Sequence, residues 1–227
     1  MAASKYSNFL TIILIILIVA ILGIGGYFVY AKVIKPYTND SNIEKAMAQF
    51  DSNIRNEIIE ENNIEQSNNE IEVTNEVLSS SSSSSSGGGN RKTYYSGYVM
   101  LGYIEIPKTG ISYPVIEDTT VKALETSVAA LYPTNAVLNS EGNTVIIGHN
   151  YRNGKFFSNN KKLSVGDKIY ITGNNGKVEY IIYQIFETTT TDTSFYGRDT
   201  GGVPEITLST CTDDGSARLI ILAKANI

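Results

Sequence analysis

The stretch ITLSTCTDDGSARLIILAKA, residues 206–225, decides the fold of this chain. Two runs rich in apolar and β-branched residues flank the polar segment TDDGSA, a pattern that favours two strands joined by a turn. We predict these strands at 203–211 and 217–225. Cys211, the single cysteine of the chain, ends the first strand, and Arg218 lies at the start of the second. An antiparallel hairpin would bring Arg218 back beside Cys211.

Five further short runs upstream have the same character and predict strands at 98–107, 111–117, 143–149, 166–172 and 176–188. The sequence GNNG between the last two is a hairpin signal. Residues 121–132, VKALETSVAALY, are predicted to form a short helix. Seven or eight strands with little helix in about 137 residues predict an all-β fold, either a barrel or a sandwich. The loop at 188–202 is predicted to be too polar to pack and, given its length, to border a site.

The chain contains one histidine, His149, which ends the predicted strand at 143–149. In a small barrel, residues at strand ends point toward the loops at the mouth. A thiol and an imidazole placed there could form a nucleophile pair, with the Arg218 guanidinium stabilising a thiolate or an oxyanion. The alternative is that Cys211 is a buried core residue, His149 a turn residue and Arg218 a surface charge. The spacing of these residues alone leaves both interpretations open.

The N-terminal third differs from the rest in hydropathy and charge. Residues 8–30 contain no charged side chain and are long enough to cross a bilayer as a helix, which needs about 20 residues. A cleaved signal peptide is the alternative, and the flanking lysines do not decide the orientation. Ser41 and Glu44 form a capping box before an amphipathic pattern that extends to about residue 60. This helix could pack on the following domain or self-associate as a stalk, and residues 79–89 are a flexible Ser/Gly linker.

The charge distribution restricts the possible partners and cofactors. Residues 41–78 hold nine acidic and two basic side chains, whereas residues 91–227 hold thirteen of each sign. With no basic excess in the folded part, we expect no nucleic-acid partner. A single cysteine excludes an internal disulfide and a cysteine-rich zinc site.

The motif TLSTC, followed by an arginine at the start of the next apolar strand, and the upstream segment GNTVIIGHN resemble the sortases. These are membrane-anchored cysteine transpeptidases of Gram-positive bacteria. The resemblance covers roughly residues 97–225 and includes GYIEIPKTGISYPVIE and FFSNNKKLSVGDKIYI. It implies a closed eight-stranded β-barrel with one or two short helices, preceded by a transmembrane helix and a helical or flexible stalk. His149 matches the family's catalytic histidine, Cys211 its nucleophile and Arg218 its arginine, while Thr210 matches a threonine that assists oxyanion or substrate contact.

The resemblance also implies a function and a domain plan. The enzyme would cleave a Leu-Pro-x-Thr-Gly-like sorting signal through a Cys thioester and transfer the secreted surface protein to an amine of a peptidoglycan precursor. The plan is a cytoplasmic N-terminus at 1–8, a single-pass membrane anchor at 9–30, an acidic helix and linker at 31–90, and an extracellular catalytic domain at 91–227. We expect no cofactor and no metal requirement, because only Glu141 stands near the histidine strand.

Three questions stay open at this point. TLSTC and GHNYRNGKFF favour a class B-like sortase, but the segment 188–203 is too short and polar for the helix expected there, which favours a class D-like enzyme. A pilin-polymerising sortase is an alternative function. A non-catalytic, surface-tethered peptide-binding barrel is another.

Overall fold

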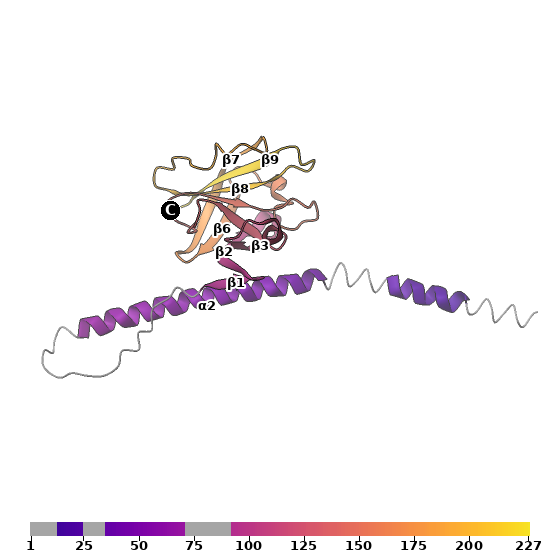
Figure 1. The fold of residues 1–227 in the computed structure, drawn as a ribbon, viewed down its shortest axis with the longest axis horizontal. Coiled ribbons are helices and arrows are strands. Elements are labelled where there is room, and N and C mark those ends of the chain that lie inside the picture. Colours follow the sequence, from indigo (N-terminus) through magenta and orange to yellow (C-terminus); the bar gives the residue numbers. More distant parts are fainter. Residues whose placement is uncertain (1–12, 25–34, 71–91) are drawn as a thin grey trace, which may run out of the picture. The chain divides into compact units, whose positions relative to one another are not determined.

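The computed structural model describes residues 13–24, 35–70 and 92–227 (Figure 1). Within these ranges the chain forms a helical segment at 13–24, one longer helix, nine strands and a few short helical turns. The elements are α2 (Lys35–Glu70), β1 (Thr93–Tyr95), β2 (Tyr98–Ile106), η3 (Pro107–Thr109), β3 (Ile111–Ile116), α3 (Val121–Leu124), β4 (Val128–Tyr132), β5 (Gly142–Ile147), η4 (Asn160–Lys162), β6 (Lys168–Gly173), β7 (Gly176–Thr188), β8 (Pro204–Cys211) and β9 (Arg218–Ala225).

Eight of the strands close into a barrel, which confirms the predicted fold class. The sheet order is β1-β2-β3-β4-β5-β8-β9-β7-β6, and β6 pairs back onto β2 to complete the ring β2–β9. Two neighbour pairs, β3 with β4 and β5 with β8, are parallel, and the others are antiparallel. The short strand β1 lies outside the ring and pairs only with β2 among the described strands. Closure leaves the eight ring strands without a free edge.

Closure of the ring depends on a glycine. Gly102 pairs with Val115 of β3 on one side and with Gly173 of β6 on the other. A Cβ atom at this position would lie 2.0 Å from the carbonyl oxygen of Thr172. Because only glycine allows so close a backbone approach, Gly102 permits β6 to pair onto β2.

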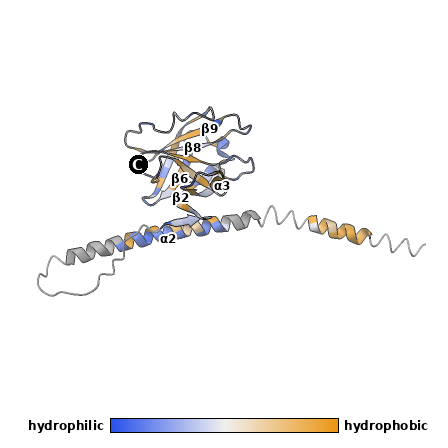
Figure 2. Cartoon of the chain, viewed as in Figure 1, coloured by the Kyte–Doolittle hydropathy of each residue, from blue (hydrophilic) through white to orange (hydrophobic). Residues whose placement is uncertain are grey.

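The barrel interior is a continuous apolar core. Alternate residues of the strands face inward, and many of them are wholly inaccessible to solvent, among them Ile104, Ile146, Ile169, Ile182 and Ala223. The orange strands of Figure 2 follow this core. It supports the strand ends at which the candidate site lies.

The segment 121–132 differs from the prediction of a short helix. Only Val121–Leu124 is helical, with the Thr120 hydroxyl accepting a hydrogen bond from the Ala123 amide at its start. The chain then forms the strand β4, which pairs with both β3 and β5. Long-range pairing and burial outweigh the helix propensity of the alanines and leucines, as tertiary context commonly does.

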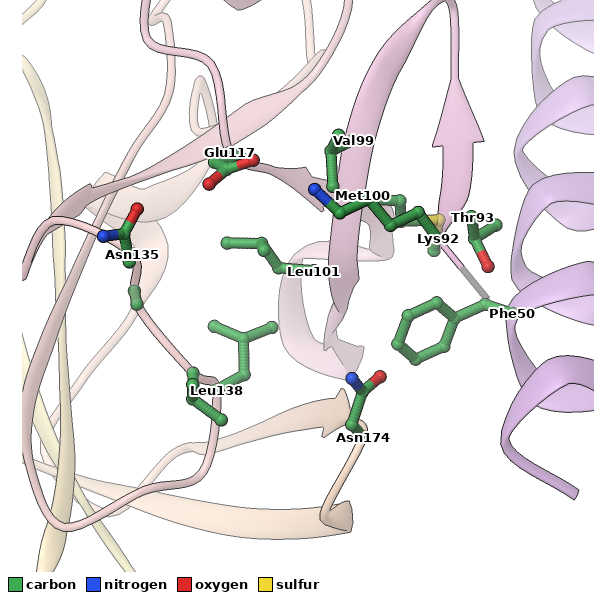
Figure 3. A pocket seen from close by; sticks show the side chains of 12 residues that line it. Phe50, Lys92, Thr93, Val99, Met100, Leu101, Glu117, Asn135, Leu138 and Asn174 are labelled. Atoms are coloured by element: carbon green, nitrogen blue, oxygen red, sulfur yellow. The ribbon is translucent and has the colours of Figure 1, made fainter. Parts of the chain in front are cut away.

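The helix α2 includes the segment predicted at 41–60, and part of it packs on the barrel. Residues 45–227 form one compact unit. Phe50 is buried and meets the Tyr103 ring edge-on at 6.3 Å between centroids. The Tyr103 hydroxyl donates to Asp51, and the Asn53 amide donates to the Thr93 hydroxyl at 2.9 Å. Figure 3 shows Phe50 of the helix lining a small pocket with Met100 and Leu101 of β2.

Residues 13–24 are helical and expose apolar side chains, including Leu14, Val19 and Leu22 (Figure 2). The predicted span at 9–30 lies only partly within the described residues. Among those residues, no helix is both long and apolar enough to cross a membrane. The predicted N-terminus at 1–8 and the Ser/Gly linker at 79–89 lie outside the described residues.

Candidate active site

Cys211 and Arg218 are direct partners in the β8–β9 ladder. Their side chains therefore project from the same face of the sheet. The guanidinium Nη1 of Arg218 lies 2.9 Å from Cys211 Sγ, within hydrogen-bond distance. Cys211 is half-buried, so its sulfur is neither sealed in the core nor fully in solvent. A fixed positive charge at this distance can stabilise the negative charge that develops on a substrate oxygen when the sulfur attacks a carbonyl.

The parallel pairing of β5 with β8 brings His149 to the same rim. The register runs from Gly142 opposite Pro204 to Ile147 opposite Ser209, and the Gly148 amide donates to the Ser209 carbonyl at 3.3 Å. His149 and Cys211 each lie two residues beyond this last pair, His149 just after β5 and Cys211 at the end of β8. The structure thus brings together three predicted site residues that come from separate parts of the sequence.

One face of the His149 ring packs against an aromatic ring, and one of its nitrogens has no hydrogen-bond partner among the described residues. It stacks on the Tyr151 ring with 4.7 Å between centroids and 21° between planes. Its Nε2 atom is buried and has no hydrogen-bond partner among the described residues. This nitrogen therefore has a hydrogen-bonding position that no described protein group occupies.

Two polar side chains tie the histidine segment to the cysteine strand. The Thr210 hydroxyl donates to the Gly148 carbonyl at 2.7 Å, and Thr210 itself is buried. The Asn150 amide donates to the Cys211 carbonyl at 3.0 Å and to Asp213 at 2.9 Å. Together they fix the residues on either side of His149 to β8. The family resemblance assigned Thr210 to oxyanion or substrate contact, whereas the structure shows its hydroxyl bonded to the Gly148 carbonyl. Asn150 was not predicted, and only its place directly after His149 hinted at it.

The turn between β8 and β9 is ordered by carboxylates. Hydrogen bonds from the hydroxyls of Thr212 and Ser216 lower the pKa of Asp214 to about 2. A hydrogen bond from Lys161, followed by one from Asn150, lowers the pKa of Asp213. Both carboxylates are therefore ionised at neutral pH, and they hold the turn that sets Arg218 beside Cys211.

The loop at 188–202 packs on the barrel, so the prediction that it is too polar to pack was wrong. Phe195 is buried in a second apolar cluster with Val145 of β5 and with Ile220 and Leu222 of β9. Tyr196 adjoins this cluster, and the charge of Arg218 partly offsets the rise that burial causes in the Tyr196 pKa. The loop thus brings Tyr196 close enough to Arg218 for the two side chains to interact electrostatically.

Arg198 holds this loop in place, and nothing in the sequence pattern indicated its role. Its guanidinium donates to the Phe195 carbonyl at 2.9 Å and to the Thr207 hydroxyl at 2.8 Å, and it forms an ion pair with Glu205. The Asn143 amide also donates to the Phe195 carbonyl, at 3.0 Å. We call Arg198, Asn143, Thr207 and Glu205 the loop clamp.

Comparison with known proteins agrees with this arrangement. A family model described as the sortase domain matches residues 104–226. Sortase A of Bacillus anthracis is 34% identical over 125 residues, which is 54% of this chain and 58% of that protein. The match therefore spans less than two thirds of that relative's length.

Two solved structures resemble the barrel. The complex of Streptococcus agalactiae sortase C1 and MTSET has a TM-score of 0.51 and 27% identity, covering 56% of this chain and 68% of that one. The pilus-related sortase C of Group B Streptococcus has the same TM-score, identity and coverage. These relatives are sortases A and C, so they give no support to the class B-like or class D-like expectation. With the family model covering more than half of its length and the cysteine, histidine and arginine meeting at one rim, the chain belongs to the sortase family.

Proposed function

We propose that this chain is a cysteine transpeptidase that cleaves a sorting signal through a thioester on Cys211 and transfers the acyl group to an amine. The observation that carries the proposal is the Arg218 guanidinium 2.9 Å from Cys211 Sγ, the sulfur of the single cysteine in the chain. A cysteine that only fills the core needs no charged partner, whereas a nucleophilic cysteine commonly has one beside it. His149 then acts as the general acid and base.

The first half of the reaction forms the acyl-enzyme. The Cys211 thiolate attacks the scissile carbonyl, and the resulting oxyanion is stabilised by the positive charge of Arg218. As the tetrahedral intermediate collapses, the C–N bond breaks and the His149 imidazolium gives its proton to the departing amine. The product is a thioester on Cys211 and a neutral His149.

The second half regenerates the enzyme. An acceptor amine attacks the thioester carbon, a C–N bond forms and the C–S bond breaks. His149 removes a proton from the attacking nitrogen, and Cys211 leaves as a thiolate. The thiolate and the protonated imidazole that entered the first half are thereby restored. Thr210 and Asn150 serve as positioning residues in both halves, because they fix the backbone around His149 to β8.

Mass spectrometry of the trapped acyl-enzyme tests this proposal. Incubation with a library of Leu-Pro-x-Thr-Gly peptides should give an adduct on Cys211 with the mass of the acyl fragment. Hydroxylamine should release the adduct, because thioesters react readily with it, and Cys211→Ala should give none. If wild-type protein binds the peptides but forms no adduct, the chain is a non-catalytic peptide-binding barrel, and the proposal fails.

A pilin-polymerising sortase is the second candidate. The observation in its favour is the structural likeness to a pilus-related sortase C. The identity to sortase A of Bacillus anthracis favours the first candidate, with a peptidoglycan precursor amine as acceptor and secreted surface proteins as donors. Supplying the acyl-enzyme with either a lysine-containing pilin peptide or a cell-wall stem peptide, and measuring which is joined faster, separates the two.

The location we propose is the cell membrane, with a single-pass anchor at 9–30 and the catalytic barrel outside the cell. The support is the uncharged run at 8–30. Protease treatment of intact cells tests it, because an extracellular barrel would be digested while a cytoplasmic barrel would be protected.

A further inference from the structure

The Tyr151 ring lies against the imidazole of the candidate site and is partly open to solvent. Its residue is 43% exposed, so the ring is not held there by the needs of the core. It stacks on His149 with 4.7 Å between ring centroids and 21° between planes. Aromatic rings prefer such near-parallel stacking, so each ring limits the rotation of the other. The only histidine of the chain is thus in contact with a ring that the core does not require.

Further rings hold Tyr151 against the barrel. It meets the Phe156 ring edge-on, with 5.8 Å between centroids and 62° between planes. Phe156 is buried, and it packs on the Tyr113 ring of β3 at 5.0 Å between centroids. A continuous row of rings therefore leads from β3 to the imidazole of His149.

The backbone after His149 folds back so that this row can form. The Phe157 amide donates to the His149 carbonyl at 3.1 Å, and the Tyr151 amide donates to the Ser158 hydroxyl at 3.0 Å. Phe156 has a φ of 49°, in the left-handed region that bulky residues rarely occupy. Such a conformation persists only where the surrounding contacts impose it. The position of the Tyr151 ring is therefore built into the segment that follows the histidine.

The hydroxyl of Tyr151 takes no part in these contacts. It forms no hydrogen bond with another residue that the structure describes. Burial, followed by the charge of Glu125, raises the pKa of Tyr151, so the phenol stays protonated at neutral pH. What His149 meets is therefore an uncharged ring face and not a polar group.

We infer that Tyr151 is a positioning residue for His149, and that its ring face fixes the plane of the imidazole during proton transfer. The inference rests on the proposed transpeptidase function. In the first half of that reaction, the C–N bond breaks as the imidazolium gives its proton to the departing nitrogen. Because a general acid must be aligned with the atom that it protonates, an imidazole that can turn about its Cβ–Cγ bond transfers the proton more slowly. Tyr151 takes no part in the bond changes themselves.

A change of leaving group isolates this role. An amine has to accept a proton to depart, whereas p-nitrophenolate departs as a stable anion. With a p-nitrophenyl ester of the same acyl peptide, the Cys211 thiolate attacks the ester carbon, a C–S bond forms and the C–O bond breaks. The electron pair leaves with p-nitrophenolate, so this step needs no proton from His149. Loss of the Tyr151 ring should therefore slow cleavage of the peptide and leave acylation by the ester unchanged.

The test compares Tyr151→Leu, which removes the ring, with Tyr151→Phe, which keeps it. With a fluorescence-quenched Leu-Pro-x-Thr-Gly peptide, we expect Tyr151→Leu to lower kcat about tenfold at unchanged KM, because a misaligned general acid forfeits part of its roughly 10²–10⁴-fold acceleration. The initial burst of p-nitrophenolate from the Leu-Pro-x-Thr ester should be unchanged. Tyr151→Phe should match wild type with both substrates. Tyr94→Leu, at an exposed tyrosine of β1, is the matched control and should alter neither.

NMR spectroscopy gives a readout that does not depend on activity. Because His149 is the only histidine, its imidazole protons can be assigned directly. The stacked ring should shift these protons upfield in wild type and in Tyr151→Phe. In Tyr151→Leu they should return toward the position of a free imidazole.

Other results would overturn the inference. Equal losses with the peptide and the ester would mean that Tyr151 acts through Cys211 or through the fold, and wild-type activity or an unchanged imidazole shift in Tyr151→Leu would mean that the stack has no such role. A loss in Tyr151→Phe as large as in Tyr151→Leu would assign the effect to the hydroxyl. Tyr151→Met serves as a second variant, and failure of both it and Tyr151→Leu to fold would make the ring a structural element.

The same assays distinguish this inference from the function on which it rests. If wild-type protein forms no acyl-enzyme with either substrate, the proposed function fails, and the role of Tyr151 fails with it. If acyl-enzyme forms but Tyr151→Leu shows no selective loss with the peptide, only the role of Tyr151 fails.

Discussion

Removing the Arg198 side chain should destabilise the barrel by a few kcal/mol, because Arg198 and Glu205 are only partly exposed and their partners Asn143 and Thr207 are buried. The side chains of Arg198 and Glu205 are 19% and 13% exposed, so their ion pair is shielded from solvent. Breaking a buried pair by removing one partner costs about 3–5 kcal/mol. In Arg198→Ala, the Tyr183 hydroxyl still donates to Glu205 at 2.8 Å, which places the expected loss near the lower end, about 3 kcal/mol.

Urea unfolding followed by circular dichroism measures this loss, with Lys168→Ala as control. Lys168 pairs with Glu179 at 2.8 Å but is 53% exposed, so its removal should cost no more than about 1 kcal/mol. For a domain of this size, a loss of about 3 kcal/mol corresponds to a fall in Tm of roughly 6–12 °C. Replacing both members, Arg198→Met with Glu205→Leu, should recover much of the loss, because no charge then stays buried alone. If Arg198→Ala cost no more than the control, the clamp would contribute as little as a surface pair, and the reasoning would be refuted.

Three further predictions concern the site, the turn and the closure of the barrel. Arg218→Ala should lower kcat by about 10²–10³, with partial activity in Arg218→Lys, as measured with a fluorescence-quenched sorting peptide; an unchanged kcat would remove Arg218 from the mechanism. The pKa of Asp214 is lowered from 3.8 to about 2, so its contribution to stability is complete above pH 3.8 and lost as the pH falls through 2. The Tm difference between wild type and Asp214→Asn should therefore be constant near neutral pH and shrink below pH 4, whereas a difference that grows on acidification would contradict the assignment. Gly102→Ala should prevent β6 from pairing onto β2, because its Cβ would lie 2.0 Å from the Thr172 oxygen, and a folded variant with wild-type Tm would show that the backbone can yield there.

Local patterns predicted most of the strands because their apolar residues alternate and their turns carry glycine, asparagine or aspartate. β7 was predicted with the bounds that the structure has, Gly176–Thr188, helped by the GNNG turn before it. β4 was missed because VKALETSVAALY is locally helical, and only its pairing with β3 and β5 makes it a strand. The strand β1 was missed because three residues are too few to show a period.

In the candidate site, too, the features set by local sequence could be predicted and those set by long-range pairing could not. The approach of Arg218 to Cys211 followed from the short turn between their strands, so the sequence could predict it. The approach of His149 depends on the parallel pairing of β5 with β8, which are far apart in the chain. The spacing of the residues could not predict this pairing, and only the family resemblance indicated that His149 belongs to the site. The loop clamp was not predictable, because the partners of Arg198 lie on three separate segments.

The packing of α2 has a practical consequence for anyone who prepares this protein in soluble form. Phe50 covers the Tyr103 ring, and Asp51 and Asn53 satisfy polar groups of β2 and β1. A truncation at the start of the strands would remove these contacts and expose the Tyr103 ring and the hydroxyls of Tyr103 and Thr93. A fragment suited to crystallisation should therefore begin before Lys45, so that it keeps the part of the helix that packs on the barrel.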